Sequence, residues 1–101
     1  MATVTLAKFY RSAMPTSSQT LATVPAGKTW AVTNIIVTNS AATAQTATVT
    51  LNGVSLIPAV SVNATAVDVY DIKQVLNAGE TITGFASSGS VTCHISGAEI
   101  A

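Results

Sequence analysis

Apolar and polar side chains alternate along most of this chain. In the segment TATVTLNG, residues 46–53, the alanine, valine and leucine fall on one side and three threonines fall on the other. Because successive side chains of a β-strand point to opposite faces, this spacing predicts a strand with one buried face. Asn52 and Gly53 then supply the two positive φ angles of a type I′ turn, so we expect a hairpin into the following segment VSLI.

The segment WAVTNIIVTN, residues 30–39, has apolar side chains on both of its alternating faces. This pattern is typical of a central strand covered on both sides, or of a strand at a subunit contact. Further strands are expected at residues 3–10, 19–24, 66–72, 81–86 and 91–96. Helical periodicity is nearly absent, although residues 71–76 could form one helical turn.

Stretches rich in Gly, Pro, Ser and Asn separate these segments, namely SAMPTSS, NSAATAQ, NAGE and SSGS. About eight short strands in a chain of 101 residues indicate an all-β sandwich, jelly roll or small barrel. Linkers and low-complexity tails are not visible. We therefore expect one domain over residues 1–101, a small antiparallel β-sandwich of jelly-roll-like form.

The charge content narrows the class of partner. Charged residues make up only 8% of the chain, and the net charge is zero. The four basic residues are scattered, so they form no stripe along which a nucleic-acid backbone could lie, and we expect no nucleic-acid partner. So few charges leave little repulsion between copies, which indicates a surface covered by other subunits. No apolar stretch approaches the roughly 18 residues that span a bilayer and no signal peptide is visible, so we expect no membrane partner and synthesis in a cytosol.

The tetrapeptide AGKT, residues 26–29, has the ending of a phosphate-binding P-loop. The full pattern G-x-x-x-x-G-K-[ST] requires a glycine where this chain has Ala22. Pro25 has no N–H to donate to a phosphate, and a strand instead of the required helix is expected after Thr29. We therefore expect no nucleotide and no other cofactor here.

A second copy of the motif supports a turn instead. NAGETI, residues 77–82, repeats the Ala-Gly-x-Thr pattern with a glutamate in the place of the lysine, which a phosphate site would not tolerate. We expect Gly27 and Gly79 to take positive φ in tight turns, with Pro25 setting φ for the first of them.

Catalytic and metal-binding arrangements are not visible in the sequence. Cys93 and His94 are neighbours, so on a strand their side chains point to opposite faces and cannot form a thiol–imidazole pair. Asp68 and Asp71 are three residues apart and also face opposite ways on a strand. A single histidine without an acidic cluster does not make a metal site. We expect no catalytic residue and no metal, and we do not expect an enzyme.

Two longer segments carry a family resemblance. VPAGKTWAVTNIIVTNSA and VLNAGETITGFASSGSVTCHISGAEI resemble the small β-sandwich structural proteins of tailed bacteriophages, over roughly residues 21–100. The resemblance implies a β-sandwich without catalytic residues that forms a homo-oligomer, often a trimer, on a repetitive lattice. Such a protein is assembled in the host cytoplasm and found in the virion, and its other partners are the major capsid protein or other virion proteins.

The resemblance leaves two roles in the particle open. The first is a capsid decoration or cement protein that binds the outside of the phage head and stabilises it. The second is a tail, baseplate or fibre component involved in assembly or receptor binding. The loops NSAATAQ and SSGS lack the aromatic and acidic residues typical of sugar sites, which favours the structural role. A β module from a cellular assembly unrelated to viruses is a third alternative.

The N-terminal residues lie outside the strongest match. Residues 1–16 contain two of the four basic residues and two of the five aromatic residues, so we expect an arm that contacts a neighbouring subunit or the shell. Its deletion is expected to abolish particle binding and leave the fold intact. Core packing or interface anchoring explains the aromatic side chains. The candidate interface residues are Lys8, Phe9, Tyr10, Arg11 and Trp30.

Overall fold

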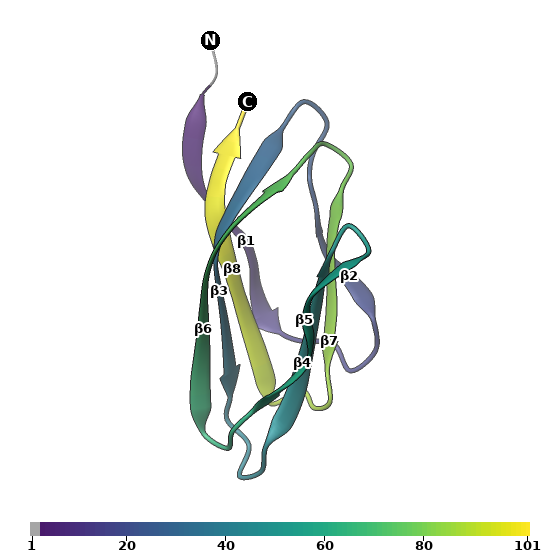
Figure 1. The fold of residues 1–101 in the computed structure, drawn as a ribbon, viewed down its shortest axis with the longest axis vertical. Coiled ribbons are helices and arrows are strands. Elements are labelled where there is room, and N and C mark those ends of the chain that lie inside the picture. Colours follow the sequence, from purple (N-terminus) through teal and green to yellow (C-terminus); the bar gives the residue numbers. More distant parts are fainter. Residues whose placement is uncertain (1–2) are drawn as a thin grey trace.

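The computed structural model describes residues 3–101 and is all-β. Figure 1 shows its eight strands, which form two packed sheets. The strands are β1 (Val4–Ala13), β2 (Gln19–Thr23), β3 (Thr29–Asn39), β4 (Gln45–Leu51), β5 (Val54–Val62), β6 (Ala66–Leu76), β7 (Thr81–Ala86) and β8 (Val91–Ile100). Every strand pairing is antiparallel.

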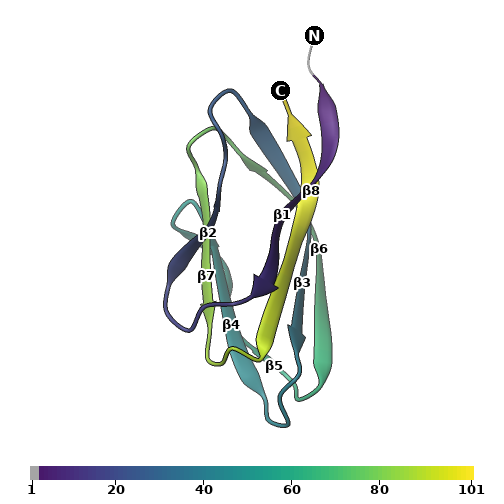
Figure 2. The ribbon, with the colours of Figure 1, turned by 180° about the vertical axis from the view of Figure 1, so that it is seen from behind.

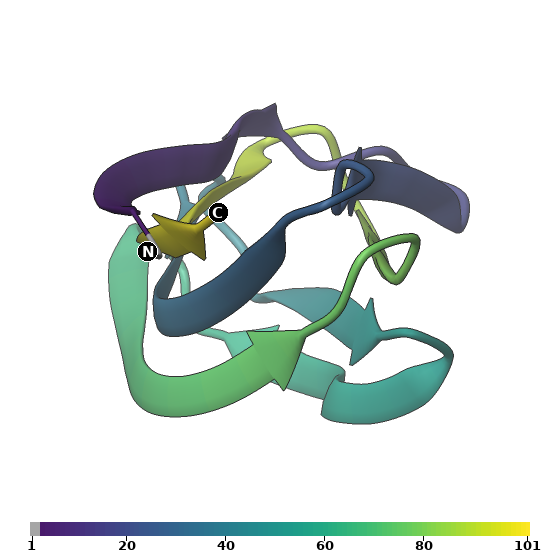
Figure 3. The same ribbon diagram turned by 90° about the horizontal axis from the view of Figure 1, so that it is seen from above.

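The strand order is that of a jelly roll. The first sheet has the order β1-β8-β3-β6, and the second has the order β2-β7-β4-β5. The first strand of the chain therefore pairs with the last, the second with the seventh, the third with the sixth and the fourth with the fifth. These four pairs form one long antiparallel ribbon of two chain halves. The ribbon folds over so that β3 also pairs with β8, and β4 also pairs with β7. Seen from behind (Figure 2) and along the long axis (Figure 3), the two sheets lie against each other. The expected small β-sandwich is confirmed.

The core lies between the two sheets and consists mainly of β-branched side chains. Val32, Ile35 and Val37 of β3 are fully buried, and they face Val49 of β4 and Ile82 of β7, which are buried to the same degree. Buried residues recur at every second position along the strands, except at an irregularity of β3 between Val32 and Asn34, so each strand turns one row of side chains inward. Residues 30–39 lie in β3, a central strand of the first sheet, whose inward side chains are buried and whose outward face is not covered within the described residues. The structure therefore does not show the strand covered on both sides that one alternative predicted.

The two AG-x-T segments are turns that lie side by side. The φ angles of Gly27 and Gly79 are 77° and 85°, and β3 begins directly after the first turn. Gly79 donates its N–H to the carbonyl oxygen of Val24 at 3.0 Å, and Val24 donates to the carbonyl oxygen of Glu80 at 2.9 Å. The repeat in the sequence thus reflects a pair of neighbouring turns at one end of the sandwich. In the β4–β5 turn, Asn52 and Gly53 have φ of 50° and 79°, as a type I′ hairpin needs.

A buried asparagine joins four segments at the other end. Asn39 is 2% exposed, and its Nδ2 lies within hydrogen-bonding distance of the carbonyl oxygens of Thr43, Val62 and Asn63, at 3.0, 3.1 and 3.3 Å. Its Oδ1 accepts the N–H of Ala41 at 2.9 Å and lies 3.5 Å from a serine hydroxyl in the β7–β8 turn. Buried polar groups need such partners, so this side chain fixes how these loops meet the end of β3.

Two expectations about chain segments are corrected. Residues 71–76 form no helical turn, because β6 runs on as a strand to Leu76. Of the expected arm at residues 1–16, residues 1 and 2 lie outside the described residues, but Val4–Ala13 is an edge strand paired along β8 and Met14 is 2% exposed in the core. Deletion of this segment would remove a strand and a core side chain, so it would not leave the fold intact.

Candidate assembly surface

The outer face of the first sheet, which is the side of β1-β8-β3-β6 that points away from the core, carries exposed apolar side chains. Among residues 3–101, six large apolar side chains are exposed, and five of them belong to the edge strands β1 and β6 of this sheet. These five are Val4, Leu6, Val67, Val69 and Val75, with exposed fractions between 58% and 88%. The sixth, Val54, lies in β5 of the other sheet. These five side chains are divided between the two edges of the outer face, which makes this face the candidate site.

The alternation along β6 explains why this strand presents valines to solvent. Val67, Val69 and Asp71 are exposed, whereas Asp68 and Tyr70 between them are half-buried and pair with the inward-facing residues of β3. Burial raises the pKa of the Tyr70 hydroxyl, and the negative charge of Asp68 raises it further. The two aspartates therefore do lie on opposite faces of the strand and form no carboxylate pair.

The outer face of the second sheet has a different character. The outward positions of β4 are threonines, and Thr50 shares a hydrogen bond between hydroxyls with Thr83 of β7. The outer face of the first sheet carries a similar threonine pair, Thr38 and Thr92, so the threonines do not distinguish the two faces. They differ in the large exposed apolar side chains at the edges of the first sheet, and this face is the candidate site.

The candidate surface carries three basic side chains and one acidic side chain. Lys8 and Arg11 are exposed on β1, at one edge of the sheet, and Asp71 and Lys73 are exposed on β6, at the other edge. A shallow hollow on this face is lined by Lys8 and Arg11 together with Leu6, Thr33 and Ser96. Two of the five predicted interface residues, Lys8 and Arg11, therefore lie on this surface.

The aromatic residues predicted for the interface are used inside the molecule. Trp30 is 6% exposed, and the ring of Phe9 stacks on it with 4.1 Å between ring centroids and 15° between ring planes. The indole Nε1 donates to Oε2 of Glu99 at 2.9 Å. The hydroxyl of Tyr10 donates to the carbonyl oxygen of Ala13 at 2.7 Å. Core packing, the other explanation for these rings, describes Trp30 and Phe9.

The residues considered for chemistry do not come together. Cys93 is fully buried, and burial raises the pKa of its thiol to about 12, so the thiol stays protonated at neutral pH. His94, half-buried, is on the opposite face of β8. Within residues 3–101 there is no group of three or more His, Cys, Asp or Glu side chains placed to hold a metal ion. The same part of the chain contains no helix long and apolar enough to cross a membrane.

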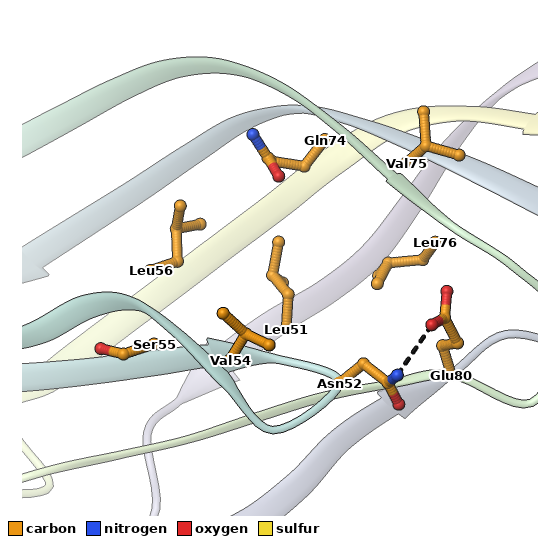
Figure 4. Close-up of a pocket in the computed structure, with 9 residues that line it drawn as sticks. All are labelled: Leu51, Asn52, Val54, Ser55, Leu56, Gln74, Val75, Leu76 and Glu80. Carbon is orange, nitrogen blue, oxygen red and sulfur yellow. Dashed lines mark hydrogen bonds between the residues drawn. The ribbon is translucent and has the colours of Figure 1, made fainter.

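A groove opens between the edge strands β5 and β6 (Figure 4). Its floor is formed by Leu51, Leu56 and Leu76, whereas Val75 points away from them. The carboxylate of Glu80, at the end of the groove, already has two hydrogen-bond partners within the protein. It accepts from Nδ2 of Asn52 at 2.7 Å and from the backbone N–H of Asn77 at 2.6 Å. The only carboxylate of the groove thus serves to hold two turns together.

No family model and no curated protein matches the chain. The resemblance to phage structural proteins therefore stays a prediction from the sequence.

None of the five exposed apolar side chains of the candidate surface was among the residues predicted for the interface. The sequence drew attention to Asp68 and Asp71 but not to the valines beside them, although Val-Asp-Val-Tyr-Asp already alternates. Which of the two faces of that pattern lies outside was decided by pairing with β3, and one strand alone does not contain this information.

Proposed function

We propose that this chain is a structural virion protein, a capsid decoration or cement protein that binds the outside of a phage head as a homo-oligomer and stabilises it. The observation that carries the proposal is the apolar outer face of the first sheet. Five exposed apolar side chains on one face are costly to leave in water, because each side chain gains free energy when it is covered. A permanent place in an assembly covers them.

The fold and the composition support the same role. Jelly rolls occur in viral capsid proteins, although they also serve in lectins and other proteins, so the fold alone does not select a function. Low charge and zero net charge weaken the repulsion between copies. The segments that resemble phage structural proteins include the two AG-x-T turns, which lie at one end of the sandwich, and β3, which follows the first turn and is a central strand of its sheet.

The amount of the chain in purified virions tests the proposal. A decoration protein is expected in molar amounts comparable to the major capsid protein, measured by quantitative mass spectrometry of particles. Purified protein added to particles that lack it should bind the heads and raise the temperature at which they release their DNA. A few copies per particle would favour the tail, baseplate or fibre role, and absence from particles would refute both.

A further inference from the structure

We propose that a second copy of this chain covers the outer face of the first sheet. The two copies pack face to face, and their two-fold axis runs parallel to the strands between β8 and β3. The inference deepens the proposed function and rests on it for its biological purpose, since it names the partner of the same surface. It also replaces the trimer that the sequence resemblance implies with a two-fold pair.

Two of the four charged side chains on the outer face, Lys8 and Asp71, lie in a single row across the sheet, whereas Arg11 and Lys73 lie outside that row. Lys8 of β1 pairs with Ser96 of β8, Ser96 pairs with Asn34 of β3, and Asn34 pairs with Asp71 of β6. Lys8 and Asp71 therefore lie at the same position along the strand direction, and they are three strand spacings, or about 14 Å, apart. Both are exposed, and no hydrogen bond or ion pair within residues 3–101 engages either side chain.

A two-fold axis parallel to the strands makes this row complementary to itself. Rotation about such an axis leaves the position of every residue along the strand direction unchanged and exchanges the two edges of the sheet. As a result, β1 of one copy lies over β6 of the other. Lys8 then faces the partner subunit's Asp71, and the symmetry produces this contact twice. An axis across the strands would instead place each edge over its own copy, with basic residues opposite basic ones.

Two of the three neighbouring rows bring apolar side chains together. On one side of the row of Lys8 and Asp71 come Leu6, Ala98, Ala31 and Val75, and exchange of the edges places Leu6 opposite the partner subunit's Val75. On the other side come first Arg11, His94, Ile36 and Val69, and then Ala13, Thr92, Thr38 and Val67. Ala13 then lies opposite the partner subunit's Val67, whereas Arg11 lies opposite the partner subunit's Val69. The central positions contributed by β8 and β3 carry small, apolar and polar side chains.

The face is large enough for a stable pair. Four strands about 4.8 Å apart and about ten residues long cover roughly 20 Å by 33 Å, or on the order of 600 Å² of flat area. Side chains roughen this plane, so the accessible area is larger and comes near the roughly 800 Å² per partner of a standard interface. Two sheets packed face to face tilt by about 30°, which displaces the edge strands by roughly 4 Å at the charged row, a distance that the long lysine side chain spans.

Exchange of the two charges tests the geometry. Lys8→Asp and Asp71→Lys each place two like-charge contacts in the proposed pair, so each should weaken self-association by about tenfold or more. In an equimolar mixture of the two variants, both contacts become attractive, and a heterodimer should form. Light scattering and sedimentation on the purified proteins should give twice the chain mass of 10.2 kDa for the wild type and for the mixture, and dissociation for each variant alone. Lys28→Asp, a charge change in the β2–β3 turn, should have no effect.

An apolar pair of variants tests the same face independently of charge. Val69→Lys, at a 62% exposed position on the outer face, should dissociate the pair, whereas Val54→Lys, at a 70% exposed position in β5, should leave it intact. Circular dichroism checks that both variants fold. A monomeric or trimeric wild type, or equal effects of the two valine variants, would overturn the inference. If one of these results were obtained while purified virions contained the chain in amounts comparable to the major capsid protein, the proposed function would still hold. If the chain formed the two-fold pair but were absent from virions, the proposed function would be wrong and the pairing would be correct.

Discussion

Replacement of Asn39 by aspartate exchanges one atom, Nδ2, for an oxygen in a buried side chain that depends on hydrogen bonds. Nδ2 has two hydrogens that it shares among three carbonyl oxygens at 3.0 to 3.3 Å, and the side chain is 2% exposed. Asn39→Asp puts a carboxylate oxygen in the place of this donor, facing the same carbonyl oxygens. The shape is kept, so the change isolates the hydrogen bonds from the packing.

The expected loss depends on pH. Two lost hydrogen bonds cost about 2 kcal/mol, and a buried charge without a partner raises the total at neutral pH to about 3–5 kcal/mol. A protonated carboxyl can donate once, so the loss at pH 3 should be about 1–2 kcal/mol. The difference of about 2–3 kcal/mol corresponds to a pKa of the introduced carboxyl raised by about two units in the folded state. Because the folded-state pKa is raised, the variant is closest to the wild type below the unfolded pKa of about 3.9 and loses stability as the pH rises towards the raised value.

Urea unfolding measured by the fluorescence of the single tryptophan gives the free energy of unfolding from pH 3 to pH 7. Asn63→Asp provides the control, because it adds the same charge at an exposed neighbouring side chain and should change stability by less than about 0.5 kcal/mol. A loss of equal size at pH 3 and pH 7, or one no larger than the control, would refute the role assigned to Nδ2.

Three further changes test other parts of the fold. Gly97→Ala should destabilise the protein by at least about 3 kcal/mol in urea unfolding, because a Cβ there would overlap the backbone carbonyl oxygen of Ala31 in β3, whereas Gly89→Ala has open space and should be neutral. Cys93 should resist alkylation at pH 8 in the folded protein and react fully in urea, since its thiol is buried and its pKa is about 12; rapid labelling of the native protein would contradict this. Phe9→Ala should cost about 2 kcal/mol and shift the emission of Trp30 to longer wavelength, because the stacked ring covers the indole; an unchanged spectrum would argue against the stack.

Local patterns in the sequence predicted much of the fold. The alternation of residues 46–53 and the Asn52-Gly53 pair predicted β4 and its hairpin, because the two-residue period of a strand and the positive φ of a type I′ turn depend only on neighbouring residues. The Ala-Gly-x-Thr turns were predictable for the same reason.

The predictions that failed concern contacts between distant segments. Trp30, a predicted interface residue, became a core residue because Phe9, twenty-one positions earlier, stacks on it. The strand predicted at residues 3–10 is present, but it continues to Ala13 and pairs along β8, at the far end of the chain, so it cannot be removed without loss of part of the fold. The extension of β6 to Leu76 likewise depends on its pairing with Trp30. A propensity for a helical turn or for an exposed arm is weak compared with such pairing and burial.

By itself, the sequence determined that this chain forms antiparallel strands with apolar and polar sides and tight glycine turns, because those properties follow from the geometry of a few consecutive residues. Only the tertiary structure decided which side of each strand lies in the core, and that Lys8 and Asp71 stand in one row at opposite edges of one sheet. Those arrangements depend on the register between residues up to 96 positions apart in the chain, as Val4 and Ile100 are, and a shift of one residue would turn every side chain of a strand to the other face.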